Sequence, residues 1–243
     1  MSIYEKSIFI GDTHVPFECK TSIKSTLTFI KAFKPNTIFL MGDIIDFYSI
    51  STFDKEPNRI TSIQSDIDIA INILKSIRKA SNKSKIIYIE GNHEHRLQKY
   101  LWKHPEISSL NALNIQNMLN LKEMDIKYIN QYKTQVYHNF VVEHGSLVRQ
   151  QSAYTAKAML LKRGMSGISG HTHRMGAHYL ANMGGNYVWY ENGCLCDLNP
   201  EYIIGKPDWM NGLSIGYFKG KRFSIEQIPI IDGIISYAGK EYK

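Results

Sequence analysis

Apolar residues occur in this chain in short, nearly continuous runs that end in glycine. These runs are rich in β-branched and aromatic side chains, which is typical of strands buried on both faces of a sheet. Three of them predict strands in the first part of the chain, at Ser7–Gly11, Thr37–Gly42 and Lys85–Gly91.

Between these runs the apolar positions recur every three or four residues, which is the spacing of one face of a helix. The pattern predicts helices over Cys19–Lys34 and Ser62–Ala80. Alternation of strand and helix predicts βαβ units around a parallel sheet, and therefore an α/β fold. We expect a further helix to start directly after Gly91, where Asn92 can cap it, and another over 105–121, with Pro105 near its first turn.

The second half of the chain predicts a hairpin over 134–145 that turns at His138-Asn139, and then a short helix closed by Gly164. Further strands are expected at Met165–Gly170, Tyr187–Glu191, Ser214–Phe218 and Phe223–Ile228. A long irregular connection over 192–212 is of a length that is usually functional or mobile. No linker divides the chain, and 243 residues favour a single domain over 1–243.

Composition narrows the class of protein. The net charge of +7 suits a polyanionic partner such as nucleic acid or nucleotides, although many basic proteins bind none and the lysines are spread along the chain. We expect a cytoplasmic protein with no membrane contact, because no signal peptide and no run of about 18 apolar residues are present. Cys19, Cys194 and Cys196 are too few for a disulfide framework, and we interpret them as reduced packing groups.

Polar residues follow five of the predicted strands at the point where each strand ends. They are Asp12 and His14, Asp43 and Asp46, Asn92 and His93, His144, and His171 and His173. The carboxyl ends of parallel strands meet at one edge of a sheet, where α/β proteins bind ligands. Side chains two residues apart in an extended segment also point the same way. The sequence therefore predicts that these groups converge on one site.

Taken singly, each of these motifs has a structural interpretation. Asp43 could cap the next turn, Asn92 is a good helix N-cap, and His144 could be a hydrogen-bonded core histidine. His171 and His173 could be two polar residues of one turn. The ordered set favours a shared site, because every member follows an apolar strand and each of the five segments carries an adjacent glycine.

The order DxH…GDxxD…GNHE…H…GHTH over residues 12–173 resembles the calcineurin-like metallophosphoesterase superfamily. The resemblance implies a four-layer α/β/β/α sandwich with a two-metal centre at the carboxyl edge of its strands. By motif, it implies Asp12, His14 and His173 as ligands of a first metal, Asn92, His144 and His171 as ligands of a second, Asp43 as the bridge between them, His93 as the catalytic histidine and Asp46 as its orienting partner.

Elementary metal chemistry agrees with that assignment. Oxygen and imidazole ligands without cysteine suit Mn²⁺, our first expectation, or Fe, Zn²⁺ or Ni²⁺. Two such cations about 3.5–4 Å apart hold a bridging water, lower its pKa to give an attacking hydroxide, and neutralise phosphate oxygens. His93 would protonate the leaving oxygen, and Asp46 would fix its tautomer. We interpret Glu94 as a first-turn acid that complements the helix dipole.

The substrate is less determined by the sequence. Protein Ser/Thr phosphatases that resemble this pattern carry Arg-Gly directly after GDxxD, and that arginine clamps a phosphate monoester. Phe47 and Tyr48 stand there in this chain. Arg96 and Arg174 are the candidate replacements, or else solvated surface side chains, and Tyr48 is a third candidate substrate contact.

Aromatic and cationic residues near the predicted site have two interpretations. Phe53, Lys55 and Arg59 can hold a nucleic-acid strand by stacking and charge, or can simply pack. Tyr202 and Trp209 lie in the late connection, which could cover the cleft as a lid or make a subunit contact.

These features favour a metal-dependent phosphoesterase that acts on phosphodiesters of nucleic acid or nucleotides. The alternatives are a phosphomonoesterase acting on protein or small molecules and a non-catalytic, metal-stabilised binding domain. The presence of His93 argues against the last, because a scaffold needs no catalytic histidine. The oligomeric state stays open.

Overall fold

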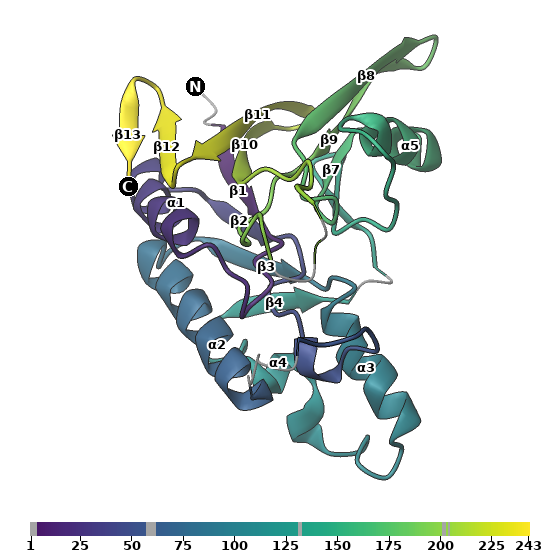
Figure 1. Cartoon of the computed structure of the whole chain (residues 1–243). Helices are drawn as coiled ribbons and strands as arrows, with labels where there is room; N and C mark the ends of the chain where they lie inside the picture. The colour runs from purple at the N-terminus through teal and green to yellow at the C-terminus, as the bar shows by residue number, and fades with distance from the viewer. Residues whose placement is uncertain (1–3, 57–61, 131–132, 201–202, 204) are drawn as a thin grey trace.

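The computed structural model describes residues 4–56, 62–130, 133–200, 203 and 205–243. Its strands form two sheets, with helices on their outer faces (Figure 1). Because residues 57–61, 201–202 and 204 are not described, the expectations for Arg59 and Tyr202 lie outside the described residues.

The first sheet has eight strands in the order β13-β12-β11-β10-β1-β2-β3-β4. Its parallel half is β1 (Glu5–Ile10), β2 (Thr37–Leu40), β3 (Lys85–Ile89) and β4 (Ile126–Ile129). Its antiparallel half is β10 (Gly212–Lys219), β11 (Arg222–Ile231), β12 (Ile234–Tyr237) and β13 (Lys240–Tyr242). Ile8, Ile38 and Ile86 lie side by side in register and are buried, so the apolar runs form the centre of this sheet.

The second sheet has five strands in the order β5-β6-β7-β9-β8. They are β5 (Gln135–Tyr137), β6 (Phe140–Glu143), β7 (Gly167–Ser169), β8 (Gly176–Asn182) and β9 (Gly185–Glu191). The predicted hairpin is confirmed, because β5 and β6 pair around His138 and Asn139. Both turn residues have positive φ, at 50° and 69°, as the right-handed twist of a tight hairpin requires.

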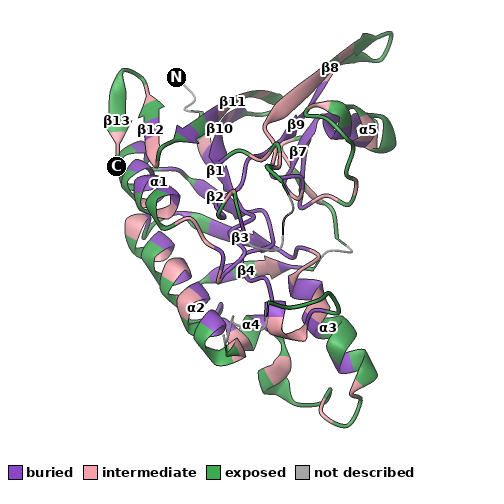
Figure 2. Cartoon of the chain, viewed as in Figure 1, coloured by how far each residue is buried: buried purple, intermediate pink, exposed green. Residues whose placement is uncertain are grey.

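Helices complete a four-layer arrangement. α1 (Lys20–Phe33) and α2 (Ile63–Ala80) pack on the first sheet, and α5 (Tyr154–Arg163) packs on the second. Between the sheets lies an aromatic core in which Phe9 stacks on Phe39 at 5.1 Å between ring centroids. Figure 2 shows the central strands buried and the outer sides of the helices exposed. The α/β/β/α sandwich implied by the motif resemblance is confirmed.

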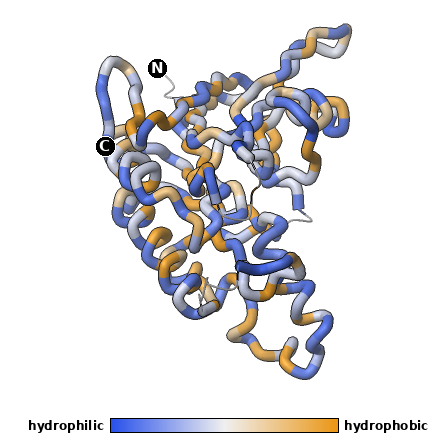
Figure 3. The backbone as a smooth tube through the Cα atoms, in the orientation of Figure 1, coloured by the Kyte–Doolittle hydropathy of each residue, from blue (hydrophilic) through white to orange (hydrophobic). Residues whose placement is uncertain are grey.

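The predicted helix over 62–80 begins as its sequence indicates. The hydroxyl of Ser62 accepts a hydrogen bond from the backbone N–H of Ser65, which satisfies one of the unpaired donors of the first turn. Ile67, Ala70, Leu74 and Ile77 are buried, three and four residues apart, on the face toward the sheet. Figure 3 shows the resulting alternation of hydrophilic and hydrophobic residues along α2.

The helix predicted over 105–121 is wrong. α3 (Glu94–Lys103) is present after Gly91, but the next segment forms turns, a short 3₁₀ helix at Asn111–Leu113 and a single turn, α4 (Ile115–Met118). The side-chain amides of Asn114 and Asn117 both donate to the carbonyl of Asn111. Asparagine side chains that bond the local backbone in this way compete with a continuous helix.

The late connection is less irregular than its sequence indicates. Cys194 forms a β-bridge with Asn211, and the Asn211 side chain donates to the carbonyl of Cys196. The backbone N–H of Met210 donates to the carbonyl of His173, which fastens the segment to the site. Within the described residues, no helix has both the length and the apolar character needed to cross a membrane.

Candidate metal centre

The loops that follow β1, β2 and β3 of the first sheet and β7 of the second open onto one cleft of about 530 Å³, and His144, after β6, lies beside Asp43 and His171 of that cleft. The predicted ligands are thus drawn together from five segments, as the strand-end pattern indicates. Its described lining residues are His14, Asp43, Asp46, Tyr48, Ser51, Phe53, Asp54, His93, Arg96, His171, His173, Ile203 and Trp209.

The first group of donors comprises Asp12, His14 and His173, all buried. Nε2 of His14 lies 2.9 Å from Nε2 of His173. Nε2 of His173 in turn lies 3.4 Å from Oδ1 of Asp12. The other ring nitrogen of His14 lies 3.0 Å from Oδ2 of Asp46, and that of His173 lies 3.7 Å from Sγ of Cys196. A partner on Nδ1 favours the tautomer with a free lone pair on Nε2, which is the atom that faces the group.

The second group comprises Asp43, His144 and His171, with Asn92 beside them. Nδ1 of His144 lies 2.8 Å from the carbonyl of Met41, so Nδ1 carries a proton and donates it. Nε2 of His144 lies 2.9 Å from Oδ1 of Asn92 and 3.2 Å from Oδ2 of Asp43. Burial lowers the pKa of His171 to about 4, so its imidazole is neutral at pH 7.

Asp43 stands between the two groups. Its Oδ2 lies 3.7 Å from Nε2 of His14, on the first side, and 3.2 Å from Nε2 of His144, on the second. Nε2 of His93 is also 3.7 Å away. One carboxylate oxygen therefore faces both donor sets, which is the position that a bridging ligand needs.

The backbone at the site adopts conformations that are uncommon for non-glycine residues. Five of the predicted ligands have φ between 50° and 73°, namely Asp12, His14, Asp43, His171 and His173. A residue in this left-handed region costs of order 1–3 kcal/mol where it is strained, and such residues cluster at functional sites. Aspartate and histidine enter this region more readily than most residues, and here it turns all five side chains into the site.

Two glycines allow the segments to approach. A Cβ atom on Gly91 would lie 2.1 Å from Oδ1 of Asp43, and one on Gly170 would lie 2.4 Å from Oδ2 of Asp12. Both contacts are too close for any side chain. The expectation that the glycines beside these motifs allow close packing is confirmed at these two positions.

Asp46 contacts two histidines rather than one. Its Oδ2 lies 3.0 Å from Nδ1 of His14 and 2.9 Å from Nδ1 of His93, and its Oδ1 accepts from Nη1 of Arg96 at 2.8 Å. Although burial opposes the charged carboxylate, these imidazoles hold the pKa of Asp46 well below its usual range. The sequence indicates Asp46 as the partner of His93, but gives no sign that Asp46 also orients a ligand of the first group.

The electrostatics of the cluster favour added positive charge. Asp12 and Asp43 are 0% and 1% exposed, and their described ion pairs are with histidines rather than with lysine or arginine. Burial disfavours a charge on His144, yet the carboxylates of Asp43 and Asp12 outweigh it and raise its pKa to about 10. Buried carboxylates need paired cations. The donor types, their facing lone pairs and this local charge fit two divalent metal ions.

A family model described as calcineurin-like phosphoesterase matches residues 6–175. The chain belongs to this family. The Gene 54 protein of Mycobacterium phage L5 is 25% identical to this chain over 254 residues, and the alignment covers 98% of this chain and 99% of the phage protein. The Gene 54 protein of Mycobacterium phage D29 is 26% identical over 249 residues, covering 97% of each.

Solved structures resemble this calcineurin-like phosphoesterase more distantly. Vacuolar Protein Sorting 29 from Cryptosporidium parvum aligns over 99% of both chains with a TM-score of 0.48 and 12% identity. Vps29 from Chaetomium thermophilum aligns over 98% of this chain and 92% of its own, with a TM-score of 0.44 and 11% identity. Both scores are below 0.5, so membership of the family rests on the matched residues 6–175.

Glu94 does more than complement a helix dipole. It lies in the first turn of α3 as expected, but it is 0% exposed and its carboxylate accepts hydrogen bonds from several groups beneath the site. The donors are the backbone N–H groups of Asp43, Ile44, Ile45 and Gly91 and the hydroxyl of Tyr88. One buried carboxylate therefore fastens the loop that carries Asp43 to the start of α3.

Glu94→Ala is expected to lower the free energy of unfolding of the metal-free protein by about 3 kcal/mol or more, because it leaves buried donors without a partner. Urea denaturation measures the change, with the exposed Glu123→Ala as the control. A loss below about 1 kcal/mol would mean that these N–H groups find other partners.

Of the residues predicted to contact substrate, some line the cleft and one does not. Tyr48 and Arg96 line the cleft, and the exposed Phe53 and the half-buried Trp209 stand beside them. Arg174 is not among the described lining residues, because its guanidinium contacts Asp208 and donates to the carbonyl of Arg149.

The cysteines and Trp209 add contacts that sequence reasoning missed. All three cysteines are free, and Cys194 and Cys196 are buried as packing groups should be. Cys196 also contacts His173, as described above, and the Trp209 ring lies 4.3 Å from the His173 ring, centroid to centroid. In the sequence, the one feature that draws attention to Cys194, Cys196 and Trp209 is that they lie in the long 192–212 connection.

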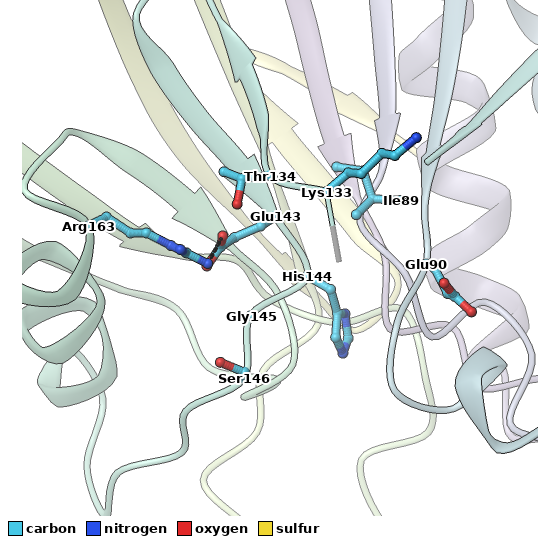
Figure 4. A pocket seen from close by; sticks show the side chains of 9 residues that line it. All are labelled: Ile89, Glu90, Lys133, Thr134, Glu143, His144, Gly145, Ser146 and Arg163. Carbon is cyan, nitrogen blue, oxygen red and sulfur yellow. Dashed lines mark hydrogen bonds and ion pairs between the residues drawn. The ribbon is translucent and has the colours of Figure 1, made fainter. Parts of the chain in front are cut away.

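A small second cavity of about 90 Å³ lies behind His144. Figure 4 shows Arg163 reaching toward Glu143, with Lys133 and Glu90 farther along the wall. Nη2 of Arg163 donates to Oε2 of Glu143 at 2.6 Å, so its charge is balanced locally. This cavity is too small for a nucleotide, whereas the cleft of about 530 Å³ has room for one and is lined by the predicted ligands.

Proposed function

We propose that this chain is a metal-dependent phosphoesterase, and that it hydrolyses phosphodiester bonds in nucleic acids or nucleotides. The observation that carries the proposal is the position of His93. Its Nε2 stands at the cleft, 3.7 Å from Oδ2 of Asp43 and 3.2 Å from Nη2 of Arg96, directly beside both donor groups. A titratable group so placed is in position for proton transfer.

Two divalent cations, with Mn²⁺ as the first expectation, would supply an activated water and neutralise phosphate oxygens when bound. The proposed ligands are Asp12, His14 and His173 for one cation, Asn92, His144 and His171 for the other, and Asp43 for both. The facing ring nitrogens and the central carboxylate described above support this division.

His93 is the proposed general acid. Asp46 holds its Nδ1 side, which turns Nε2 toward the cleft, where it can give a proton to the leaving oxygen. Burial lowers the pKa of His93, but the carboxylates of Asp43 and Asp46 outweigh that effect and raise it above its usual value. Nη2 of Arg96, which can only donate, lies 3.2 Å from Nε2, so this contact opens when Nε2 gives a proton to the leaving oxygen.

The cleft walls support a diester of a nucleic acid or nucleotide. Phe47 is buried, and the Tyr48 hydroxyl accepts from the backbone N–H of Glu56, so the two residues supply no cation in place of the phosphatase arginine. Arg96 is fixed on Asp46 and is the one arginine among the described cleft residues. Phe53 is 73% exposed at the cleft and offers a flat apolar face on which a base can stack.

A substrate panel tests the proposal. Purified protein with Mn²⁺ is assayed against bis-p-nitrophenyl phosphate, p-nitrophenyl phosphate and labelled single- and double-stranded DNA. The proposal predicts turnover of the diester, at least about tenfold above that of the monoester in kcat/KM, and cleavage of DNA. Turnover of the monoester alone would replace it with a phosphomonoesterase, and inertness with two metals bound would replace it with a binding domain.

A further inference from the structure

α3 leads directly out of the candidate metal centre. It begins at Glu94, next to His93, and ends at Lys103. Figure 1 shows this helix extending from the end of the sheets, on the side away from α1, while the segment after it turns back to α4. A ligand that occupies the cleft and extends beyond one phosphoester can therefore contact α3.

The helix has one buried and one exposed face. Leu97 and Leu101 are buried toward the body of the protein. Arg96, Lys99, Tyr100 and Lys103, which we call the α3 stripe, are three, four and seven residues apart and so share one face of the helix. Arg96 lines the cleft, whereas the other three are exposed.

The charge of the α3 stripe is entirely positive. The helix contains one acid, Glu94, which is buried and bonded beneath the site. The acid that contacts the stripe is Asp46, whose Oδ1 accepts from Nη1 of Arg96 at 2.8 Å, and Glu106 pairs with His104 beyond the helix. A lysine in the last turn, such as Lys103, is explained by the helix dipole alone. The dipole does not explain a row that extends back to the cleft.

Aromatic side chains accompany the cations. Tyr100 packs on His104 with 4.3 Å between ring centroids and is 36% exposed. Phe53 lies 6.0 Å from the guanidinium of Arg96, where the stripe meets the cleft. Cations that follow a backbone, interleaved with rings that stack on bases, are the features by which proteins hold single strands.

We propose that the α3 stripe binds the sugar–phosphate backbone of a single-stranded nucleic acid as it leaves the metal centre, with Phe53 and Tyr100 stacking on its bases. This inference rests on the proposed function. From Arg96 to Lys103 the helix advances about 10 Å at 1.5 Å per residue. Duplex DNA keeps its bases paired and gives the rings no face to stack on.

The test uses the Lys99→Glu/Lys103→Glu and Tyr100→Ala variants of the full chain. Binding of a labelled 12-nucleotide single strand is followed by fluorescence anisotropy in EDTA at several salt concentrations, and turnover of bis-p-nitrophenyl phosphate is followed with Mn²⁺. The charge-reversal variant should bind the strand at least tenfold more weakly. Its log–log salt slope should fall by about 1.4, which is two phosphate contacts at about 0.7 each.

Tyr100→Ala should weaken single-strand binding by more than it weakens duplex binding. Lys99, Tyr100 and Lys103 are not among the described residues that line the cleft, so kcat/KM for the small diester should stay within twofold of wild type. Lys75→Glu/Lys79→Glu on α2 is the matched control, because this exposed pair has the same four-residue spacing and the same charge change. It should leave strand binding unchanged.

Three results would overturn the inference. They are a loss no larger than that of the α2 control, an equal loss for duplex and single strand in Tyr100→Ala, and equal competition by poly-glutamate at matched charge. The binding arm contains no metal and involves no turnover. Failure of the proposed function would appear instead as an inactive wild-type protein in the diester assay.

Discussion

His93→Gln is expected to lower kcat for phosphodiester hydrolysis by roughly 10²- to 10⁴-fold, the usual contribution of a positioned general acid. Glutamine removes the titratable nitrogen that faces the cleft and the contact between His93 Nδ1 and Asp46. The proposed ligands are unchanged, and Asp46 keeps its contact with His14. Metal content should therefore stay at the wild-type value while turnover falls.

The leaving group separates proton donation from other roles of His93. p-Nitrophenolate departs without a proton, whereas an aliphatic alkoxide requires one. The loss in kcat should be much larger for an alkyl ester than for bis-p-nitrophenyl phosphate. His178→Gln, on the edge strand β8, is the control for the same chemical change. An equal loss with both leaving groups, or a parallel loss of metal, would contradict the role assigned to His93.

The sequence was informative where local pattern and tertiary structure agree. The runs at Ser7–Gly11, Thr37–Gly42 and Lys85–Gly91 correspond to β1, β2 and β3, because strands buried on both faces need continuous apolar residues. The convergence of the strand-end residues followed from parallel topology, in which these ends share one edge. The roles given to the ligands stay predictions until metal is measured.

Features that depend on partners from elsewhere in the chain were not predictable. Glu94 reads as an ordinary first-turn acid until the loop after β2 is placed over it. The second contact of Asp46, on His14, requires two loops to be aligned in space. The 105–121 segment has an apolar pattern compatible with a helix, but local bonds made by its asparagines prevail.

The hydrophobic pattern of the sequence did not predict the more exposed strands. β8 has no fully buried residue, β13 has none either, and β12 is short with only Ile235 buried. β4 is a short edge strand that is buried only at its two ends, Ile126 and Ile129. Their pairing is determined by neighbours that the sequence does not identify, so local hydrophobicity carries little information about them.

The second large effect is expected for Asp43→Asn. The substitution keeps the shape of the side chain but removes the negative charge between the two donor groups. His14, in the first donor group, and His144, in the second, then lose the carboxylate charge that lies between them. We expect loss of most bound metal and a decrease in kcat/KM of about 10³-fold, or about 4 kcal/mol. Asp54→Asn makes the same change at an exposed position of the cleft and should have little effect.

The central claim is that buried side chains from five segments hold two cations on either side of Asp43. Its most direct measurement is the number of metal ions per chain, by mass spectrometry of the elements, after dialysis of wild type and Asp43→Asn against Mn²⁺. The account predicts close to two for wild type and fewer than one for the variant. Fewer than one ion per chain in wild type, or two in both proteins, would contradict it.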